Sequence, residues 1–303
     1  MGLIRDARVL LRGRDWRGRS RTPRSAVEHQ HPEPARDFPT GWARTPAVNN
    51  TRKALQRALL TPLTWSQTRP QVEGLDRLES VRGPVVLVAN HSSHLDAPLI
   101  LGSLPRRLAD RMAVGAAADY FFDARWRAAV TALVFNAFPV ERYRSRRLRS
   151  LAPDLLARGW SLLLFPEGTR SEDGWMSNLR LGPAHLCVTQ QVPAIPVVLR
   201  GTYAAMPRGR NWPLPGRPRV VVRYGTPLIP GDEEDARKFN IRLATSIAQL
   251  WTEDELGWYR SMRKEADGDL SLPTAPPVAA WRRIWESSRP LEHPDPPRAW
   301  PRD

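Results

Sequence analysis

The chain has 303 residues, of which 41% are hydrophobic, so it can bury one substantial core with polar segments left over. Its net charge of +15 and pI of about 11.2 favour an anionic partner such as nucleic acid, a phospholipid surface or a phosphorylated substrate. Cys187 is the only cysteine, which excludes an intramolecular disulfide.

No segment approaches the roughly 18 to 20 uncharged apolar residues of a membrane-spanning helix. The nearest stretch is 128–140, which Asn136 interrupts. The amino terminus lacks the basic end and apolar core of a secretory signal. We therefore expect a protein that is neither exported nor integral to a membrane, but that can lie on one.

Composition divides the chain into three parts. Residues 1–48 are rich in arginine and proline and are expected to form a disordered tail, because they cannot bury enough apolar area to fold alone. This tail is a solvated segment, an electrostatic tether to anionic lipid or an organellar transit peptide. The folded domain is expected over 49–260, with a Pro-rich extension over 261–303.

The domain begins with a predicted amphipathic helix at 51–66, whose basic neighbours suit a membrane interface. Apolar runs and helical patterns then alternate through the motif-bearing core at 70–230 and beyond. The predicted strands are 85–89, 112–116, 137–140, 161–165, 194–199 and 219–223. The predicted helices are 95–104, 126–135, 148–157, 183–189, 235–251 and 279–286. This order predicts an α/β fold with a mainly parallel central sheet flanked by helices.

The first polar motif, Asn-His-Ser-Ser-His-Leu-Asp at 90–96, lies where a buried strand ends and a helix begins. In α/β sheets that edge is the usual place for ligands. A neutral His91 can take a proton from a hydroxyl, and Asp96 can orient the imidazole and stabilise its charged form. Helix capping with a hydrogen-bonded histidine is the structural alternative. His94 also allows a metal-site interpretation, but no third well-spaced His or Cys ligand is evident.

The second motif, Phe-Pro-Glu-Gly-Thr-Arg-Ser at 165–171, follows another buried strand. Pro166 and Gly168 predict a tight turn that presents an acid, a hydroxyl and a guanidinium. The guanidinium of Arg170 can bind a phosphate with two parallel hydrogen bonds. A plain polar turn is the structural alternative.

Together the two motifs resemble the glycerolipid acyltransferase family that includes 1-acylglycerol-3-phosphate acyltransferase. Its Asn-His-x-x-x-x-Asp block matches 90–96, with His91 and Asp96 as the catalytic positions, and its Phe-Pro-Glu-Gly-Thr-Arg-Ser block matches 165–171 without a departure. Two weaker blocks match 138–142 and 192–197. The family often has Phe-Lys-x-Gly downstream, where this chain has Leu179-Arg180-Leu181-Gly182.

The resemblance implies transfer of a fatty acyl group from acyl-CoA or acyl carrier protein to the free hydroxyl of 1-acylglycerol-3-phosphate, giving phosphatidic acid. His91 and Asp96 would be the catalytic pair, and no metal or other cofactor would be needed. The substrate-binding residues that it implies are Arg142, Glu167, Gly168, Thr169, Arg170 and Arg180.

These expectations place the protein as a peripheral enzyme on the cytoplasmic face of a membrane. Its partners would be the phospholipid surface, the acyl donor and a lysophospholipid acceptor, with no nucleic acid. Another lysolipid, glycolipid or aminolipid acceptor is the near alternative. Two alternatives come from other classes of protein. The basic charge permits a nucleic-acid-binding protein, although no nucleic-acid-binding module appears in the sequence. The other alternative is a catalytically silent membrane scaffold that keeps the fold.

Overall fold

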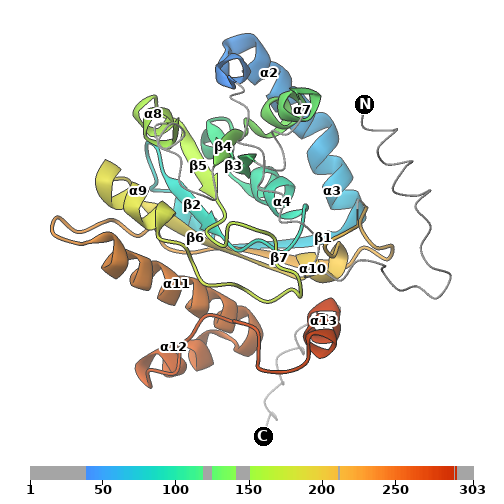
Figure 1. The fold of residues 1–303 in the computed structure, drawn as a ribbon, viewed down its shortest axis with the longest axis vertical. Coiled ribbons are helices and arrows are strands. Elements are labelled where there is room, and N and C mark those ends of the chain that lie inside the picture. Colours follow the sequence, from blue (N-terminus) through green and yellow to red (C-terminus); the bar gives the residue numbers. More distant parts are fainter. Residues whose placement is uncertain (1–38, 119–124, 141–150, 211, 290, 292–303) are drawn as a thin grey trace, which may run out of the picture. The chain divides into compact units, whose positions relative to one another are not determined.

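The computed structural model describes residues 39–118, 125–140, 151–210, 212–289 and 291, which belong to one compact unit, Arg36–Asp303. Its centre is a seven-stranded sheet in the order β1-β7-β6-β2-β5-β3-β4 (Figure 1). The strands are β1 (Arg69–Glu73), β2 (Val86–Ala89), β3 (Met112–Ala117), β4 (Phe138–Val140), β5 (Ser161–Leu164), β6 (Ala194–Arg200) and β7 (Arg219–Tyr224).

The sheet is mainly parallel, as the alternating pattern predicts. β2 pairs in parallel with both β5 and β6, and the only antiparallel pair in the described sheet is β6 with β7. Because β1 is parallel to β7, these two strands run opposite to the other five. All four residues of β2 are buried, as expected of a central parallel strand covered on both faces.

Helices cover both faces of the sheet. One face packs against α4 and α5, and the other against α8, α9 and α11. The helices of the described residues, besides short 3₁₀ turns and one π-helical turn at Gln56–Leu60, are α2 (Pro46–Leu55), α3 (Thr61–Gln67), α4 (Asp96–Ser103), α5 (Arg106–Ala109), α7 (Arg125–Phe135), α8 (Leu151–Ala157), α9 (Gly182–Gln190), α10 (Thr202–Ala205), α11 (Ala236–Leu256), α12 (Trp258–Ala266) and α13 (Ala280–Ser288).

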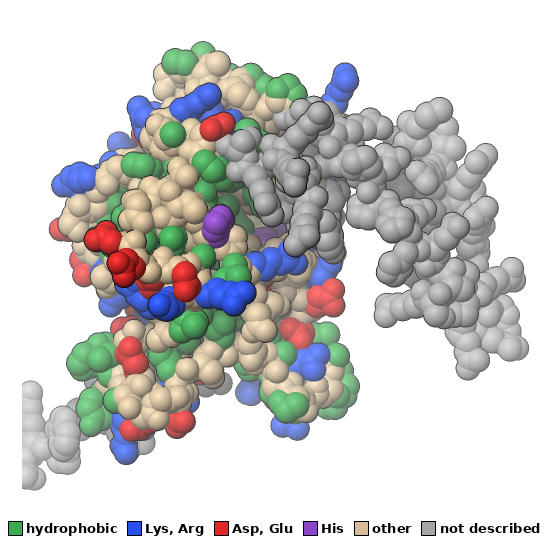
Figure 2. All heavy atoms as spheres, turned by 60° about the vertical axis from the view of Figure 1, so that its left-hand side comes forward, with side chains coloured by type: hydrophobic (Ala, Val, Ile, Leu, Met, Phe, Trp, Pro, Cys, Tyr) green, Lys and Arg blue, Asp and Glu red, His purple; other side chains and the backbone are tan. Residues whose placement is uncertain are grey.

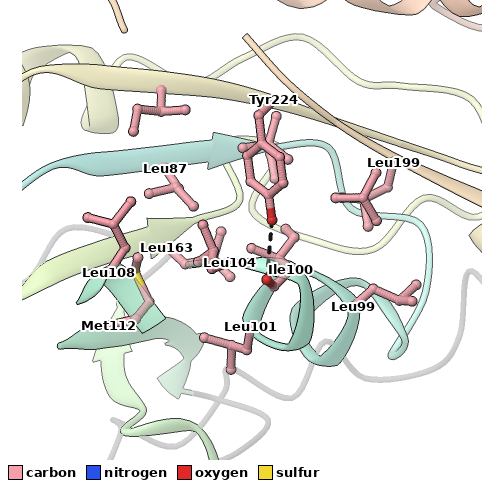
Figure 3. Packing of buried hydrophobic residues seen from close by; sticks show 14 of the residues in the cluster. Leu87, Leu99, Ile100, Leu101, Leu104, Leu108, Met112, Leu163, Leu199 and Tyr224 are labelled. Atoms are coloured by element: carbon pink, nitrogen blue, oxygen red, sulfur yellow. Dashed lines mark hydrogen bonds between the residues drawn. The ribbon is translucent and has the colours of Figure 1, made fainter. Parts of the chain in front are cut away.

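Alternation along the strands divides the core in two. Leu87 and Leu163 point to the α4 face, and Val86 and Leu162 point to the other face. Figure 3 shows the first cluster closing over α4, where the buried Tyr224 hydroxyl donates to the carbonyl oxygen of Ile100 at 3.2 Å. This packing fixes α4, and with it the residues that precede its first turn.

Besides the short 3₁₀ turns, four elements are absent from the predicted set, and one of them is the four-residue helix α5. β1 is an edge strand with alternating exposure and a proline, so its sequence carries no apolar run. α10 is a single turn after Gly201, too short for a periodic pattern. α12 follows α11 after Gly257, which has a φ of +85° and separates two helical segments.

The predicted helix at 51–66 corresponds to continuous helical structure over Pro46–Gln67, so ordered structure begins within the predicted tail. Trp65 packs against the core, whereas Leu59 and Leu63 are exposed. The predicted position of this helix in a membrane interface stays a prediction. Residues 1–38 of the predicted tail lie outside the described residues. Across the described parts of the chain, no helix combines the length and apolar character needed to span a membrane.

Candidate active site

Two motifs far apart in the sequence meet at one edge of the sheet. β2 and β5 are parallel neighbours, with Val88 paired to Leu164. The residues that follow them therefore leave the sheet side by side at its carboxyl edge. This juxtaposition places 90–96 against 165–171, as the predicted crevice requires.

His91 and Asp96 form a hydrogen-bonded pair. The imidazole Nδ1 lies 2.8 Å from Oδ2 of Asp96, which is fully buried at the start of α4. The same oxygen accepts the backbone N–H groups of Ser92 at 2.7 Å and Ser93 at 2.8 Å. Because Nδ1 is engaged by a carboxylate, Nε2 on the other side of the ring is the nitrogen able to accept a proton.

The His91 ring is also held from one side by the second motif. It stacks on the ring of Phe165, with centroids 4.1 Å apart and planes 22° apart. The side chain of His91 keeps 19% of its surface exposed. A fixed, partly accessible imidazole is the arrangement that a general base requires.

The carboxyl group of Glu167 joins the backbone of the first motif to the backbone of Ser177, beyond the second motif. Its Oε1 accepts the N–H of His91 at 2.7 Å, and its Oε2 accepts the N–H of Ser177 at 2.9 Å. In return, the N–H of Ser171 donates to the carbonyl oxygen of His91 at 2.8 Å. The backbone of His91 is thus held on both sides by the segment that follows β5.

Burial raises the pKa of Glu167 from its ordinary value of 4.5 to about 7, against the two backbone donors that favour the carboxylate; the charge of Asp96 adds to the rise. The carboxyl group therefore stabilises the fold most below pH 4.5, and that contribution is lost as the pH rises to about 7. We expect the free energy of unfolding of the wild type, relative to Glu167→Gln, to fall by up to about 3 kcal/mol between pH 4.5 and 7.5.

Urea unfolding of both proteins across this pH range measures the difference. The exposed Glu233→Gln variant is the matched control and should follow the wild type at every pH. A constant difference between the wild type and Glu167→Gln would contradict the raised pKa.

Gly168 is required by the turn after Glu167. Its φ is +76°, and an added Cβ would lie 2.8 Å from the guanidinium carbon of Arg180. The backbone N–H of Arg180 donates to the carbonyl oxygen of Pro166 at 3.1 Å. The structure therefore brings Arg180 over the turn of the second motif.

Arg170 and His94 lie close to each other beside the His91–Asp96 pair. Burial, reinforced by the charge of Arg170, lowers the pKa of His94 from 6.5 to about 4, so this imidazole is neutral at neutral pH. A neutral His94 therefore adds no positive charge of its own beside Arg170. The sequence predicts Arg170 as a substrate-binding residue, but it does not predict that His94 lies close to it.

Buried polar side chains fix the loop that carries His91. Asn90 bridges to β6, donating from Nδ2 to the carbonyl oxygen of Leu199 at 2.9 Å and accepting its N–H at 2.7 Å. The Ser93 hydroxyl donates to the carbonyl oxygen of Met206 at 2.9 Å. These serine and asparagine positions belong to the recognised motif, and their role is to anchor the loop.

The C-terminal helix α13 is fastened to the segment after the second motif. Arg283 forms an ion pair with Asp173 at 2.7 Å, and the Ser287 hydroxyl donates to the carbonyl oxygen of Asp173. The carbonyl oxygen of Pro273 also accepts the N–H of Met176 at 3.1 Å. The sequence predicts a short helix here but not its contact with the site.

The structure places the predicted site residues in different ways. His91, Asp96 and Glu167 are directly linked, and Gly168, Arg170 and Arg180 lie in or against the turn of the second motif. Thr169 lies in the same turn, where its hydroxyl makes only a 3.4 Å contact with the carbonyl oxygen of Arg170. The predicted Arg142 lies outside the described residues. Glu167 is buried with both oxygens bonded to backbone, so binding of the acceptor by this side chain stays a prediction.

The site combines an α/β sheet with a histidine–aspartate pair at the carboxyl edge of its central strands. This arrangement suits general-base catalysis. Comparison with known proteins names the family. Residues 69–200 match the family Acyltransferase, a range that contains both motifs. This part of the chain is similar to the acyltransferase family, and its resemblance to the glycerolipid acyltransferases is confirmed.

Three relatives show the extent of the similarity. The chain is 32% identical over 180 residues to mouse 1-acyl-sn-glycerol-3-phosphate acyltransferase alpha, covering 56% of this chain and 59% of the mouse protein. It is 31% identical over 155 residues to the chloroplastic enzyme LPAT1 of Arabidopsis thaliana, covering 50% and 42%. The crystal structure of the 1-acyl-sn-glycerophosphate (LPA) acyltransferase PlsC from Thermotoga maritima matches with a TM-score of 0.52 and 26% identity, covering 73% of this chain and 84% of that one. The chain spans about half the length of the curated relatives that it matches.

Proposed function

We propose that the chain is an acyltransferase that moves a fatty acyl group from a thioester to the hydroxyl of a lysophospholipid. The observation that carries this proposal is the position of His91. Its ring is bonded to Asp96, and its backbone is held between Glu167 and Ser171. Residues of the first motif and of the segment after β5 thus hold one imidazole at the carboxyl edge of the sheet.

In the proposed reaction, Nε2 of His91 takes the proton from the acceptor hydroxyl. The oxygen attacks the thioester carbonyl carbon, forming the new ester bond, and the carbon–sulfur bond breaks. The leaving sulfur takes the proton back from the imidazolium and departs as a thiol, so no net proton is gained or lost. Asp96 keeps the proton of the neutral ring on Nδ1 and stabilises the imidazolium.

The acceptor is proposed to be 1-acylglycerol-3-phosphate, with acyl-CoA or acyl carrier protein as donor. The names of the mouse and Arabidopsis relatives support this substrate. Arg170 and Arg180, beside the His91 loop, are suited to the phosphate because guanidinium groups bind it with paired hydrogen bonds. The arginine at 180, where the family often has lysine, favours a second candidate, the same chemistry on a different lysolipid.

The test is thiol release from a long-chain acyl-CoA, with detergent-dispersed lysophosphatidic acid present or absent. Release that requires the acceptor would support the proposal. No release with this acceptor, with a panel of other lysolipids, or with acyl carrier protein as donor would contradict it. A gel-shift assay with DNA at increasing salt would detect the alternative of a nucleic-acid-binding protein.

Arg170→Ala is expected to raise the KM for the phosphorylated acceptor by about tenfold or more with a smaller change in kcat, because a charge-assisted bond worth about 1.5–3 kcal/mol is lost. Steady-state kinetics with the acceptor varied at saturating donor measures this effect. Arg210→Ala, an exposed arginine outside the motifs, is the control. An unchanged KM for Arg170→Ala would assign the phosphate to other residues.

A further inference from the structure

The C-terminal helix α13 has an exposed apolar side. Ile284 and Trp285 follow Trp281 by three and four residues, so the three side chains share one side of the helix. Their exposed fractions are 72%, 41% and 58%. Two tryptophans on one short helix are a large apolar surface to leave in water.

The opposite side of α13 is committed to the active-site segment. Arg283 and Ser287, one helical turn apart, both bind Asp173. Asp173 in turn accepts the N–H of Trp175 through Oδ1 at 3.2 Å, and the next residues lead to Ser177, which binds Glu167. A short series of hydrogen bonds therefore joins this helix to the backbone of His91.

Basic groups border the tryptophan side. Arg289 lies over the ring of Trp285 at 5.0 Å, and Arg282 forms an exposed pair with Glu286 at 3.2 Å. The lower end of the molecule, formed by α12 and α13 in Figure 1, shows hydrophobic and charged side chains side by side at the surface in Figure 2. Tryptophan next to arginine is typical of helices that lie at the boundary between lipid headgroups and acyl chains.

We propose that the Trp281–Ile284–Trp285 side of α13 docks on an anionic phospholipid surface. The tryptophan rings enter the headgroup region, and Arg282 and Arg289 meet the lipid phosphates. The inference rests on the proposed function in one respect: the acceptor is a membrane lipid, and α13 would hold the segment after the second motif against the membrane that supplies it. This is a different surface from the exposed leucines of the N-terminal helical segment.

The choice of lipid over a second protein follows from the surface itself. The two tryptophan rings are exposed along one side of a nine-residue helix. Their border holds two arginines, Arg282 and Arg289, and one acid, Glu286, and the chain carries a net charge of +15, which is complementary to anionic headgroups. A helix of this kind gains apolar burial and charge attraction from a bilayer without needing a shaped partner.

The experiment is co-sedimentation of the full chain with vesicles of phosphatidylcholine alone or mixed with phosphatidylglycerol. Tighter binding of the wild type to the mixed vesicles is expected, and the double variant Trp281→Ala/Trp285→Ala should bind them at least about tenfold more weakly. Ile241→Ala, which removes an exposed apolar side chain from α11, is the matched control and should bind like the wild type. Melting curves of all three proteins verify that they are folded.

Wild-type binding by the double variant would overturn the proposal, as would an equal loss in Ile241→Ala. Equal binding of the wild type to the two kinds of vesicle would contradict the proposed preference of α13 for anionic lipid. A dimer of the wild type that the double variant loses, with vesicle binding unchanged, would show that a second copy covers this side of α13. Because His91→Ala should bind vesicles like the wild type, the result stands apart from the test of acyl transfer.

Discussion

Replacing His91 with alanine is expected to lower kcat by about two to four orders of magnitude, because general-base assistance contributes about that much. The geometry leaves little room for a substitute base. Nδ1 is 2.8 Å from Asp96, and the neighbouring half-buried His94 is a weak base because desolvation and the charge of Arg170 lower its pKa to about 4. The measurement is acceptor-dependent thiol release at saturating substrates.

His185→Ala is the matched control, because His185 is an exposed histidine on α9 away from both motifs. It should retain wild-type turnover. A His91→Ala enzyme within tenfold of the wild type would end the mechanism proposed above. Equal melting temperatures of the two variants would exclude unfolding as the cause of a loss.

Asp96→Asn is expected to reduce kcat by about two to four orders of magnitude, and by no more than His91→Ala does, because the carboxylate acts through the same imidazole. Oδ2 of Asp96 faces Nδ1 of His91 and also accepts the N–H groups of Ser92 and Ser93, so we expect the amide oxygen to take this position in the variant. Because the amide is neutral, it no longer stabilises the imidazolium that forms during proton transfer.

The combination with His91→Ala tests whether the two residues act as one unit. The double variant should be no slower than His91→Ala alone, because effects of groups that act together are not additive. A further loss of the Asp96→Asn size in the double variant would separate the two roles. Asp232→Asn, at an exposed loop position, controls for the loss of one negative charge.

The sequence predicts the central sheet because its buried strands are short apolar runs that alternate with helical patterns. Val86–Ala89 and Ser161–Leu164 are nearly wholly buried, and their carboxyl ends carry the two motifs. The spacing of His91 and Asp96 likewise specifies a local contact, since His91 lies in the short loop before α4 and Asp96 is the first residue of that helix. Local patterns of this kind can be interpreted without the rest of the molecule.

Contacts between distant segments could not be predicted in the same way. The position of Glu167 beneath the backbone of His91 depends on the register of β2 with β5, which no local pattern specifies. The edge strand β1 is defined by its partner β7 rather than by its own residues. The attachment of Arg283 to Asp173 likewise joins two polar residues that a sequence pattern would leave in solvent.

The hydrogen bond between His91 and Glu167 has a consequence for how the protein becomes active. These residues are 76 positions apart, so the bond closes a long loop that includes β3, α7, β4 and α8. The entropy of closing that loop is offset by pairing of β2 with β5 and by the core around them, not by the polar contact. A nascent chain released before residue 167 contains the whole first motif yet lacks the group that holds its histidine in place. Acyl transfer should therefore appear only once the central strands have paired, which makes activity during refolding a direct reporter of sheet assembly.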